Sequence, residues 1–308
     1  FPAAIKSVAE WFPKRERAFA TGIFNAGTNV ASMFGPFLIA YLTIQYGWRA
    51  CFIITASAGL LLMIVWLLLY RTPEAHKSVN KAELEHIRSD APAEDNEPKL
   101  SWKAAASLKQ TWGFSIAKFL TDPVWWFYLW WLPLYLTDVH KLTLDQIRWP
   151  ILLVYGIADV GSVFFGWVPG YLIRQGWDAG RARKAAMAMC AALMPISSLA
   201  VFADNVWLAV ALVSVATACH QGWSANLFTT TSDVFPKRVV GSVVGIGGCV
   251  GGLGSAVFAS LVPGIIIQHF GYTPAFLAMG FFHLTALLVV HKLMGGLKPI
   301  TLAPVAVT

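Results

Sequence analysis

The chain has 308 residues, of which 57% are hydrophobic and 13% are charged, with a formal net charge of +7. Soluble domains carry about 25% charged residues, so the composition excludes a soluble globule, and it is too apolar for a disordered chain. Four cysteines in apolar runs exclude a disulfide scaffold, and we interpret all four as buried free thiols. The composition is that of a membrane protein.

In chain order, a partial helix over Phe1–Glu10 precedes eight apolar runs long enough to cross a hydrocarbon core of about 30 Å. The runs cover residues 18–44, 49–70, 112–137, 148–173, 185–203, 206–229, 240–268 and 272–294. Between the second and third runs, Thr72–Lys103 is rich in acidic residues and has three prolines. This composition predicts a solvated linker, with a short helix over Lys81–Arg88.

The basic residues fall mostly on one side of this arrangement. If the runs cross alternately, 18 of the 23 lysines and arginines lie in the loops of one side and three in those of the other. By the positive-inside rule the richer side is cytoplasmic, which places the linker and the C-terminus there. We therefore expect a multi-pass protein of the inner (plasma) membrane. The asymmetry explains the basic charge without a nucleic-acid partner.

A short motif occurs twice, 223 residues apart: Glu10-Trp-Phe-Pro13-Lys14-Arg15 returns as Asp233-Val-Phe-Pro236-Lys237-Arg238. About 45 residues that begin with the motif are duplicated, which predicts two bundles related by an axis normal to the membrane. The second copy follows four spans and the first only a partial helix. We therefore expect about three and a half spans to precede Phe1 in the native protein.

These segments resemble the major facilitator superfamily, and within it the anion:cation symporters and their hexuronate transporters. The resemblance covers essentially the whole chain and rests on Phe1–Ala18, Gly22–Asn29, Lys118–Tyr128, Ile157–Ser162 and His220–Asn226. It implies an all-α, polytopic two-bundle fold, with about eight full transmembrane helices plus a partial one. The implied domains are a remnant of the N-terminal bundle (1–70), a cytoplasmic linker (71–110), a C-terminal six-helix bundle (111–297) and a cytoplasmic tail (298–308).

The resemblance implies a secondary active transporter that takes up a sugar acid, a hexuronate, together with protons by alternating access. It would work as a monomer in the lipid bilayer, without a cofactor, a metal or an enzymatic activity. Tartrate, an aldonate or a sugar phosphate is an alternative substrate. A membrane-embedded enzyme, a channel or a sensor is the alternative class, although no Ser/His or metal-ligand spacing supports an enzyme.

Charges inside the predicted spans are the first candidates for a transport site, because a charge at mid-bilayer costs about 2.5–3.5 kcal/mol even on a lenient scale. Lys118 and Asp122 are one helical turn apart and can pair, and Asp159 lies about as deep as Asp122. Lys118 could bind the substrate carboxylate, with Asp122 or Asp159 in proton coupling. A purely structural ion pair is the alternative. Trp126, four residues after Asp122, is the aromatic residue expected on the same face.

Polar side chains mark three further spans. The run 206–229 carries Thr217, His220, Gln221 and Ser224 on one face, with Trp223 and Asn226 adjoining. These side chains could bind a polyol acid, with His220 as a second candidate for proton coupling, or they could form a polar seam between helices. The same two interpretations apply to Asn25 and Asn29, and to Tyr155 beside Asp159.

The two Pro-Lys-Arg loops are interpreted as orientation signals, as a cytoplasmic gate, or as both. In a gate, Glu10, Arg15, Asp233 and Arg238 would supply the ion pairs. Seven glycines between Gly241 and Gly254 give small residues at helical spacing and predict close helix packing, not a nucleotide site.

Overall fold

The computed structural model describes residues 1–89 and 101–300, apart from the side chains of Asn29, Ser32, Pro36, Phe37, Ala40 and Leu144. All regular elements in this part of the chain are helical. The helices are α1 (Pro2–Trp11), α2 (Lys14–Leu69), η1 (Pro73–Ala75), α3 (Lys81–Arg88), α4 (Trp102–Ser107), α5 (Lys109–Asp138), α6 (Leu144–Arg174), α7 (Ala179–Leu193), η2 (Met194–Phe202), α8 (Val206–Val234), α9 (Lys237–Ser255), η3 (Ala256–Leu261), α10 (Val262–Phe270) and α11 (Tyr272–Met294).

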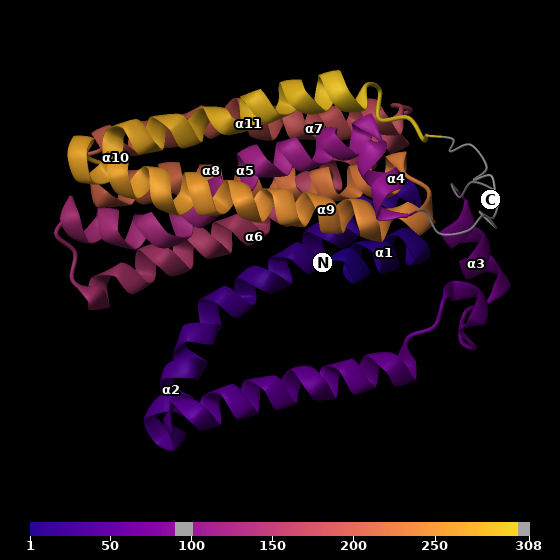
Figure 1. Cartoon of the computed structure of the whole chain (residues 1–308), viewed down its shortest axis with the longest axis horizontal. Coiled ribbons are helices and arrows are strands. Elements are labelled where there is room, and N and C mark those ends of the chain that lie inside the picture. Colours follow the sequence, from indigo (N-terminus) through magenta and orange to yellow (C-terminus); the bar gives the residue numbers. More distant parts are fainter. Residues whose placement is uncertain (90–100, 301–308) are drawn as a thin grey trace.

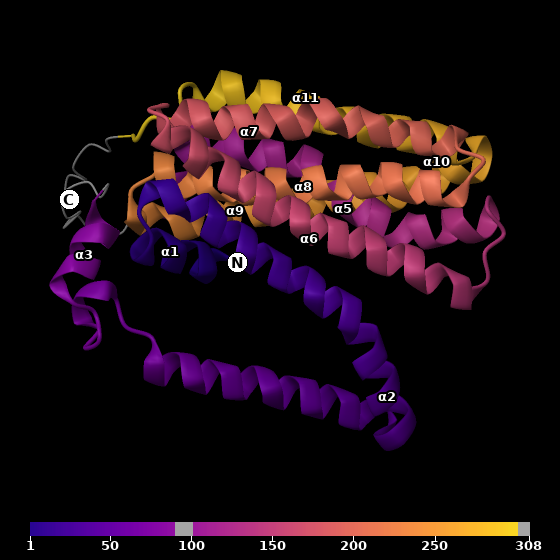
Figure 2. The ribbon, with the colours of Figure 1, turned by 180° about the vertical axis from the view of Figure 1, so that it is seen from behind.

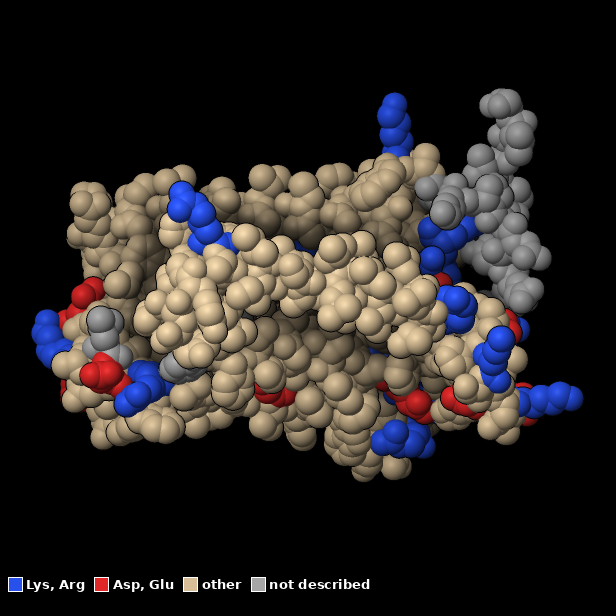
Figure 3. All heavy atoms as spheres, turned by 90° about the horizontal axis from the view of Figure 1, so that it is seen from below, with Lys and Arg blue, Asp and Glu red and all other residues tan. Residues whose placement is uncertain are grey.

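The long helices α5 to α11 lie side by side in one bundle, and α1 and the first half of α2 lie against it (Figure 1). The second half of α2 runs apart from the bundle, as the view from behind also shows (Figure 2). We call the end of the bundle with the α1–α2, α6–α7 and α8–α9 connections the basic end. On the face shown in Figure 3, charged side chains gather toward the two ends, and uncharged surface covers most of the middle.

Helix α2 is two helices in sequence, because Gly47 interrupts it with φ 79° and ψ 161°. Residues with a side chain rarely adopt this backbone conformation, whereas glycine adopts it without strain. The segment Tyr41–Leu69, which contains this break, is strongly apolar, and none of its most apolar stretch is buried. The predicted boundary between the first two apolar runs therefore falls at this glycine.

Six helical segments in the described residues are long and apolar enough to cross a membrane. They are Tyr41–Leu69, Asp145–Arg174, Ala179–Phe202, Val206–Val234, Lys237–Phe270 and Tyr272–Met294. Helix α5 has 30 residues but is not among them, because its charges and its run of tryptophans lower its mean hydropathy. The first half of α2 is not among them either, so the count of eight full spans stays a prediction.

The first half of α2 approaches α6 closely at the basic end. A Cβ added to Gly166 would lie 2.6 Å from the Ala18 carbonyl oxygen, and a Cβ added to Gly22 would lie 2.5 Å from the Ser162 carbonyl oxygen. The Ser162 hydroxyl in turn donates to the Gly22 carbonyl at 3.0 Å. Glycine is thus required on both helices for this antiparallel crossing.

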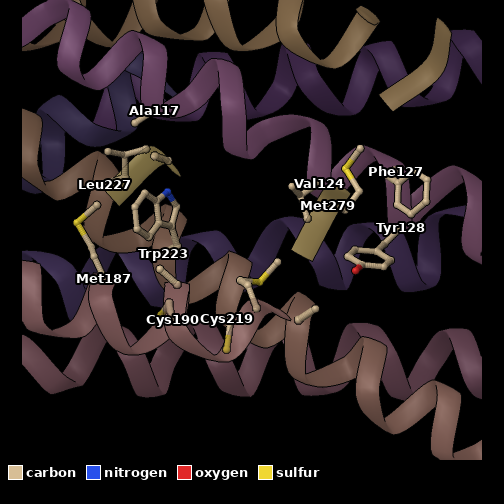
Figure 4. Close-up of a cluster of buried hydrophobic side chains, with 14 of the residues drawn as sticks. Ala117, Val124, Phe127, Tyr128, Met187, Cys190, Cys219, Trp223, Leu227 and Met279 are labelled. Carbon is tan, nitrogen blue, oxygen red and sulfur yellow. The ribbon is translucent and has the colours of Figure 1, made fainter. Parts of the chain in front are cut away.

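The core of the bundle lies between α5, α8 and the helices that flank them. Figure 4 shows Trp223 beside Met187 and Leu227, and Cys190 and Cys219 lie next to each other in the same cluster. The four cysteines are free, and three are buried as predicted, but Cys249 on α9 is exposed. That prediction was wrong because an apolar run is buried only on the face that packs, and the rest of a membrane helix faces outward.

The linker helix predicted over residues 81–88 is α3. The Asn80 side chain caps its N-terminus by accepting a hydrogen bond from the Glu83 amide at 2.8 Å. His86 of α3 contacts Glu16 of α2 at 3.0 Å and Arg15 at 3.1 Å, and Arg88 binds Glu74 at 2.6 Å. The His86 contacts attach the linker to the basic end of α2, and the Arg88 contact joins α3 to η1 within the linker.

Candidate functional site

An ion pair between the buried Lys118 and the half-buried Asp122 lies near the middle of α5. Lys118 Nζ is 2.7 Å from Asp122 Oδ2 and 3.0 Å from Oδ1. Lys118 is 6% exposed, and counting about 1.5 Å per residue from Lys109 places the two residues about 14 and 20 Å along a helix of about 45 Å. The predicted pairing across one helical turn is therefore present, and the pair lies where burial of charge is most costly.

Helix α8 covers this pair with its polar face. The Lys118 ammonium lies 4.4 Å from the centre of the Phe228 ring, a cation–π contact. One and two turns away along α8, the same face carries Ser224 and His220. His220 is 5% exposed, and Gln221 beside it is equally well buried.

Trp125 of α5 provides the aromatic wall of the site. Its ring stacks on His220, with centroids 5.7 Å apart and an interplanar angle of 17°, and meets Tyr155 of α6 edge-on at 5.8 Å. Trp125 follows Lys118 by seven residues and Asp122 by three, so all three share one helical face. A small cavity next to this wall is lined by Trp125, Tyr128, Leu129, Leu132, Ile151, Val154, Tyr155 and Thr217.

The predicted aromatic residue Trp126 lies elsewhere. It is 40% exposed and packs on Trp130 at the outer surface of the bundle, with ring centroids 5.4 Å apart. The sequence prediction followed the spacing of four residues from Asp122 and overlooked the spacing of seven from Lys118. Trp125 therefore replaces Trp126 in the site.

Trp223 and Asn226 are both buried inside the bundle, away from the Lys118 side of α8. Trp223 is fully buried, and the Asn226 amide donates to the carbonyls of Phe165 at 2.8 Å and Gly222 at 2.9 Å. The second bond is local, and the first joins α8 to α6. The position of Asn226 thus matches the alternative of a polar seam between helices.

Asn25 of α2 reaches the site from the other side, because its amide donates to Ser224 Oγ at 3.3 Å. Asp159 of α6 is half-buried, and the crossing of Gly22 with Ser162 places it about one turn farther along, near the level of Asn25. The side chain of Asn29 lies outside the described residues. The site therefore combines residues from α2, α5, α6 and α8.

The predicted gate residues form separate contacts at the basic end. Asp233, which is 6% exposed, binds Arg183 Nε through Oδ2 at 2.9 Å and lies 3.5 Å from Arg17 Nη1. Arg183 also donates to the Lys14 carbonyl, and Arg17 to that of Ser232. Among the described residues, the ion-pair partners of Asp233 are thus Arg183 and Arg17 and not Arg238.

The first copy of the motif has different partners. Glu10 lies 3.6 Å from Lys6 Nζ and accepts a hydrogen bond from the Tyr70 hydroxyl at 2.5 Å. Burial and this contact with Glu10 raise the pKa of Tyr70 above its ordinary value. Arg15 binds Glu16 at 3.4 Å and His86. Glu10 and Arg15 therefore connect α1 and α2 to the chain that follows them, while Asp233 connects the two halves of the chain.

A further buried contact involves a residue that the sequence analysis did not single out. His283 of α11 is fully buried, and its Nε2 lies 3.3 Å from Nδ1 of His220. The edge of its ring also faces Trp223 at 5.3 Å between centroids. The only signal in the sequence was a histidine in the middle of a largely apolar run.

Comparison with known proteins points to one family. A sequence model of the Major Facilitator Superfamily matches residues 1–259. The hexuronate transporter of Escherichia coli (strain K12) is 29% identical over 297 residues, which are 95% of this chain and 68% of that protein. The D-galactonate transporter of Escherichia coli O6:H1 is 28% identical, with 97% of this chain and 71% of that protein covered.

Three further proteins extend this result. A probable galactarate/D-glucarate transporter of Bacillus subtilis (strain 168) is 27% identical, with 98% of this chain and 68% of that protein covered. Among solved structures, the E. coli fucose:proton symporter aligns with a TM-score of 0.64 at 17% identity, over 94% of this chain and 72% of that one. The proton:xylose symporter XylE aligns with a TM-score of 0.63 at 13% identity, over 96% and 68%. At such identities the structures establish the fold alone.

Proposed function

This chain belongs to the Major Facilitator Superfamily, and we propose that it takes up a hexuronate together with protons by alternating access. The family consists of transporters, so the enzyme considered as an alternative is excluded. Its relatives are named as transporters of hexuronates, of D-galactonate and of galactarate or D-glucarate. The hexuronate as substrate, the coupling to protons and the roles of individual residues are the proposal.

The observation that carries it is the ion pair of the buried Lys118 with the half-buried Asp122, opposite the polar face of α8. A single ammonium in a poorly hydrated site is a strong partner for a carboxylate, because a charge-assisted hydrogen bond is stronger there than in water. We assign the uronate carboxylate to Lys118. The rest of the sugar acid would then lie along Trp125, His220 and Ser224.

Charge balance supplies a reason for proton coupling. When the uronate carboxylate binds, one Lys118 ammonium faces two carboxylates, that of the substrate and that of Asp122. Two like charges around one cation favour protonation of one of them. We therefore assign the coupling proton to Asp122, with Asp159 as the second acid of the site.

The side chains around the pair suit a polyhydroxylated acid. Trp125 and Tyr155 offer apolar ring faces for the C–H bonds of the sugar, and His220, Gln221, Asn25 and Ser224 offer donors and acceptors for its hydroxyl groups. Trp223 and Asn226 do not enter this proposal, because both are buried away from Lys118. Asn29 remains a candidate by its position on α2.

Alternating access requires that one end of the site close while the other opens. In this structure Asp233, Arg183 and Arg17 join the two halves of the chain at the basic end. We propose that this end is cytoplasmic, as the excess of basic loop residues suggests, with the linker and the C-terminus on the same side. The transporter would work as a monomer in the inner membrane, with this cluster as its cytoplasmic gate.

Uptake into vesicles tests the proposal. Labelled glucuronate or galacturonate is offered to vesicles containing the full-length protein, with and without an inward proton gradient. We expect saturable uptake that the gradient accelerates and that unlabelled uronates inhibit more strongly than galactonate, glucarate or a neutral hexose. Uptake at the same rate with and without the gradient would contradict the proposed coupling to protons. Inhibition by galactonate or glucarate alone would identify another sugar acid as the substrate.

A further inference from the structure

His220 and His283 form a buried pair behind the candidate site. His220 Nδ1 and His283 Nε2 are 3.3 Å apart, and the rings meet edge-on with centroids 5.3 Å apart. His283 is fully buried and His220 is 5% exposed. This pair lies on α8 and α11, so it connects a residue of the proposed binding surface to a helix outside that surface.

Both rings are neutral in this arrangement. Among the described residues no ion pair joins either imidazole to a carboxylate, and a charged ring at this depth would carry a large desolvation cost. A neutral imidazole has one N–H donor and one bare nitrogen acceptor. In the contact between the two histidines, one ring therefore donates and the other accepts.

The surroundings of His283 decide which ring donates. Its other nitrogen, Nδ1, is buried without a hydrogen-bond partner. If His220 donated, His283 would have to carry its proton on Nδ1, and a buried N–H would lack an acceptor. Buried N–H groups without a partner are rarer than acceptors without one. His283 therefore donates from Nε2, and its bare Nδ1 is the unpaired atom.

The neighbouring tryptophan agrees with this choice. The indole N–H of Trp223 is also buried without a partner, and its ring lies 5.3 Å from that of His283 between centroids. The ring that contacts His283 edge-on thus carries an unpaired donor and no acceptor. A donor neighbour favours a bare nitrogen on His283 and disfavours an N–H there.

We propose that His283 is a positioning residue, which holds His220 in the tautomer that presents its Nε2–H as a donor to the substrate anion. Because Nδ1 of His220 accepts from His283, the proton of His220 must be on Nε2. The two ring nitrogens point in widely different directions, so Nε2 points away from α11, and the ring is held flat against Trp125. A fixed N–H donor near the Lys118 ammonium favours binding of a substrate group that accepts hydrogen bonds, such as a carboxylate or hydroxyl oxygen, over a group that only donates. This inference rests on the binding role proposed for His220.

The tautomer can be measured without transport. We would record ¹⁵N NMR spectra of histidine-labelled protein in bilayers and assign the two residues with the variants His220→Phe and His283→Met. The expected result is His220 protonated on Nε2 and His283 with a bare Nδ1. His220 protonated on Nδ1 would overturn the inference, whether or not the protein transports a uronate.

Two substitutions then separate positioning from packing. His283→Gln keeps an N–H donor at a similar reach, whereas His283→Met keeps the size and removes the donor. We expect galacturonate affinity within about twofold of the original for His283→Gln and about tenfold weaker for His283→Met. His269→Met, which changes an exposed histidine at the end of α10, is the matched control and should leave affinity unchanged.

The effect of His283→Met should vanish when His220 is already Phe, because the donor that it positions is then absent. Equal losses for His283→Gln and His283→Met, or an undiminished loss in the His220→Phe background, would contradict positioning and indicate packing. If no variant and not even the original protein bound a sugar acid, the proposed function would fail, and the NMR spectra would still decide the tautomer.

Discussion

Gly251 of α9 leaves the space that the Asp122 carboxylate occupies. A methyl group added to this glycine would overlap Asp122 Oδ2 and lie 3.2 Å from Lys118 Cβ. The ion pair of α5 is therefore held against the backbone of α9. One of the glycines that predicted close helix packing thus also shapes the candidate site.

Gly251→Ala should accordingly displace the Asp122 carboxylate and weaken its pairing with Lys118. We expect proton-driven uptake to fall at least tenfold. The folded bundle should be retained, because an added methyl group in a packed contact typically lowers the free energy of unfolding by only about 1–3 kcal/mol. Uptake and thermal unfolding of the purified variant measure the two effects. Gly248→Ala is the matched control, because nothing lies within 4 Å of a methyl group there. Equal effects of the two substitutions would contradict this role of Gly251.

Substitutions of the ion pair distinguish transport roles from a structural role. Asp122→Asn should abolish uphill accumulation but preserve exchange of internal for external substrate, because exchange needs no net movement of protons. Counterflow and accumulation assays measure the two activities. If the pair is only structural, each single substitution leaves a buried charge unpaired and lowers stability, and Lys118→Gln with Asp122→Asn restores both folding and transport. A fully active double variant would therefore return both residues to a structural role.

The cluster at the basic end should hold the two halves of the chain together. Asp233→Asn removes the anionic partner of the buried Arg183, and breaking such a pair costs about 3–5 kcal/mol. We expect a lower thermal unfolding temperature and faster hydrogen exchange around residues 12–18 and 230–238. Glu10→Gln is the control, because the ion pair that it breaks, with the largely exposed Lys6, is 3.6 Å long, and a glutamine oxygen can still accept from the Tyr70 hydroxyl. An equal or larger effect of Glu10→Gln would contradict the assignment of the gate to Asp233.

The contact between η1 and α3 in the linker should depend on pH through Glu74. Burial acts to raise the pKa of Glu74, but hydrogen bonds from Arg88 and neighbouring groups outweigh it, so the pKa lies below its ordinary value of 4.5. A lowered carboxyl pKa stabilises the folded arrangement above about pH 4.5, and this contribution disappears as the pH falls through the lowered pKa. We expect hydrogen exchange in α3 to accelerate in that range. Arg88→Gln should remove the pH dependence, and its persistence would assign it to another group.

The local parts of the site could be predicted from the sequence. A spacing of four residues places Lys118 and Asp122 on one helical face, and the structure pairs them. The same reasoning could have found Trp125 at a spacing of seven. The helix over 81–88 was likewise predictable, because its capping residue and its composition are local signals.

The remaining contacts depend on how distant helices pack. Asp233 meets Arg17, which is far away in the chain, and no local pattern distinguishes that arginine from Arg15 or Arg238. His283 could not be predicted as a site residue, because no polar partner lies one helical turn away from it in the sequence. Its role follows only from the contact between α11 and α8.

The central claim is that the Lys118 ammonium binds the carboxylate of a sugar acid. Binding of galacturonate and of neutral galactose to the purified original protein and to Lys118→Gln, measured by calorimetry, tests it most directly. We predict that the original protein prefers the acid and that Lys118→Gln weakens galacturonate binding about ten- to hundredfold, as expected for the loss of one charge-assisted hydrogen bond. The same substitution should leave the weak binding of galactose unchanged. Unchanged galacturonate affinity in a folded Lys118→Gln variant would contradict the account.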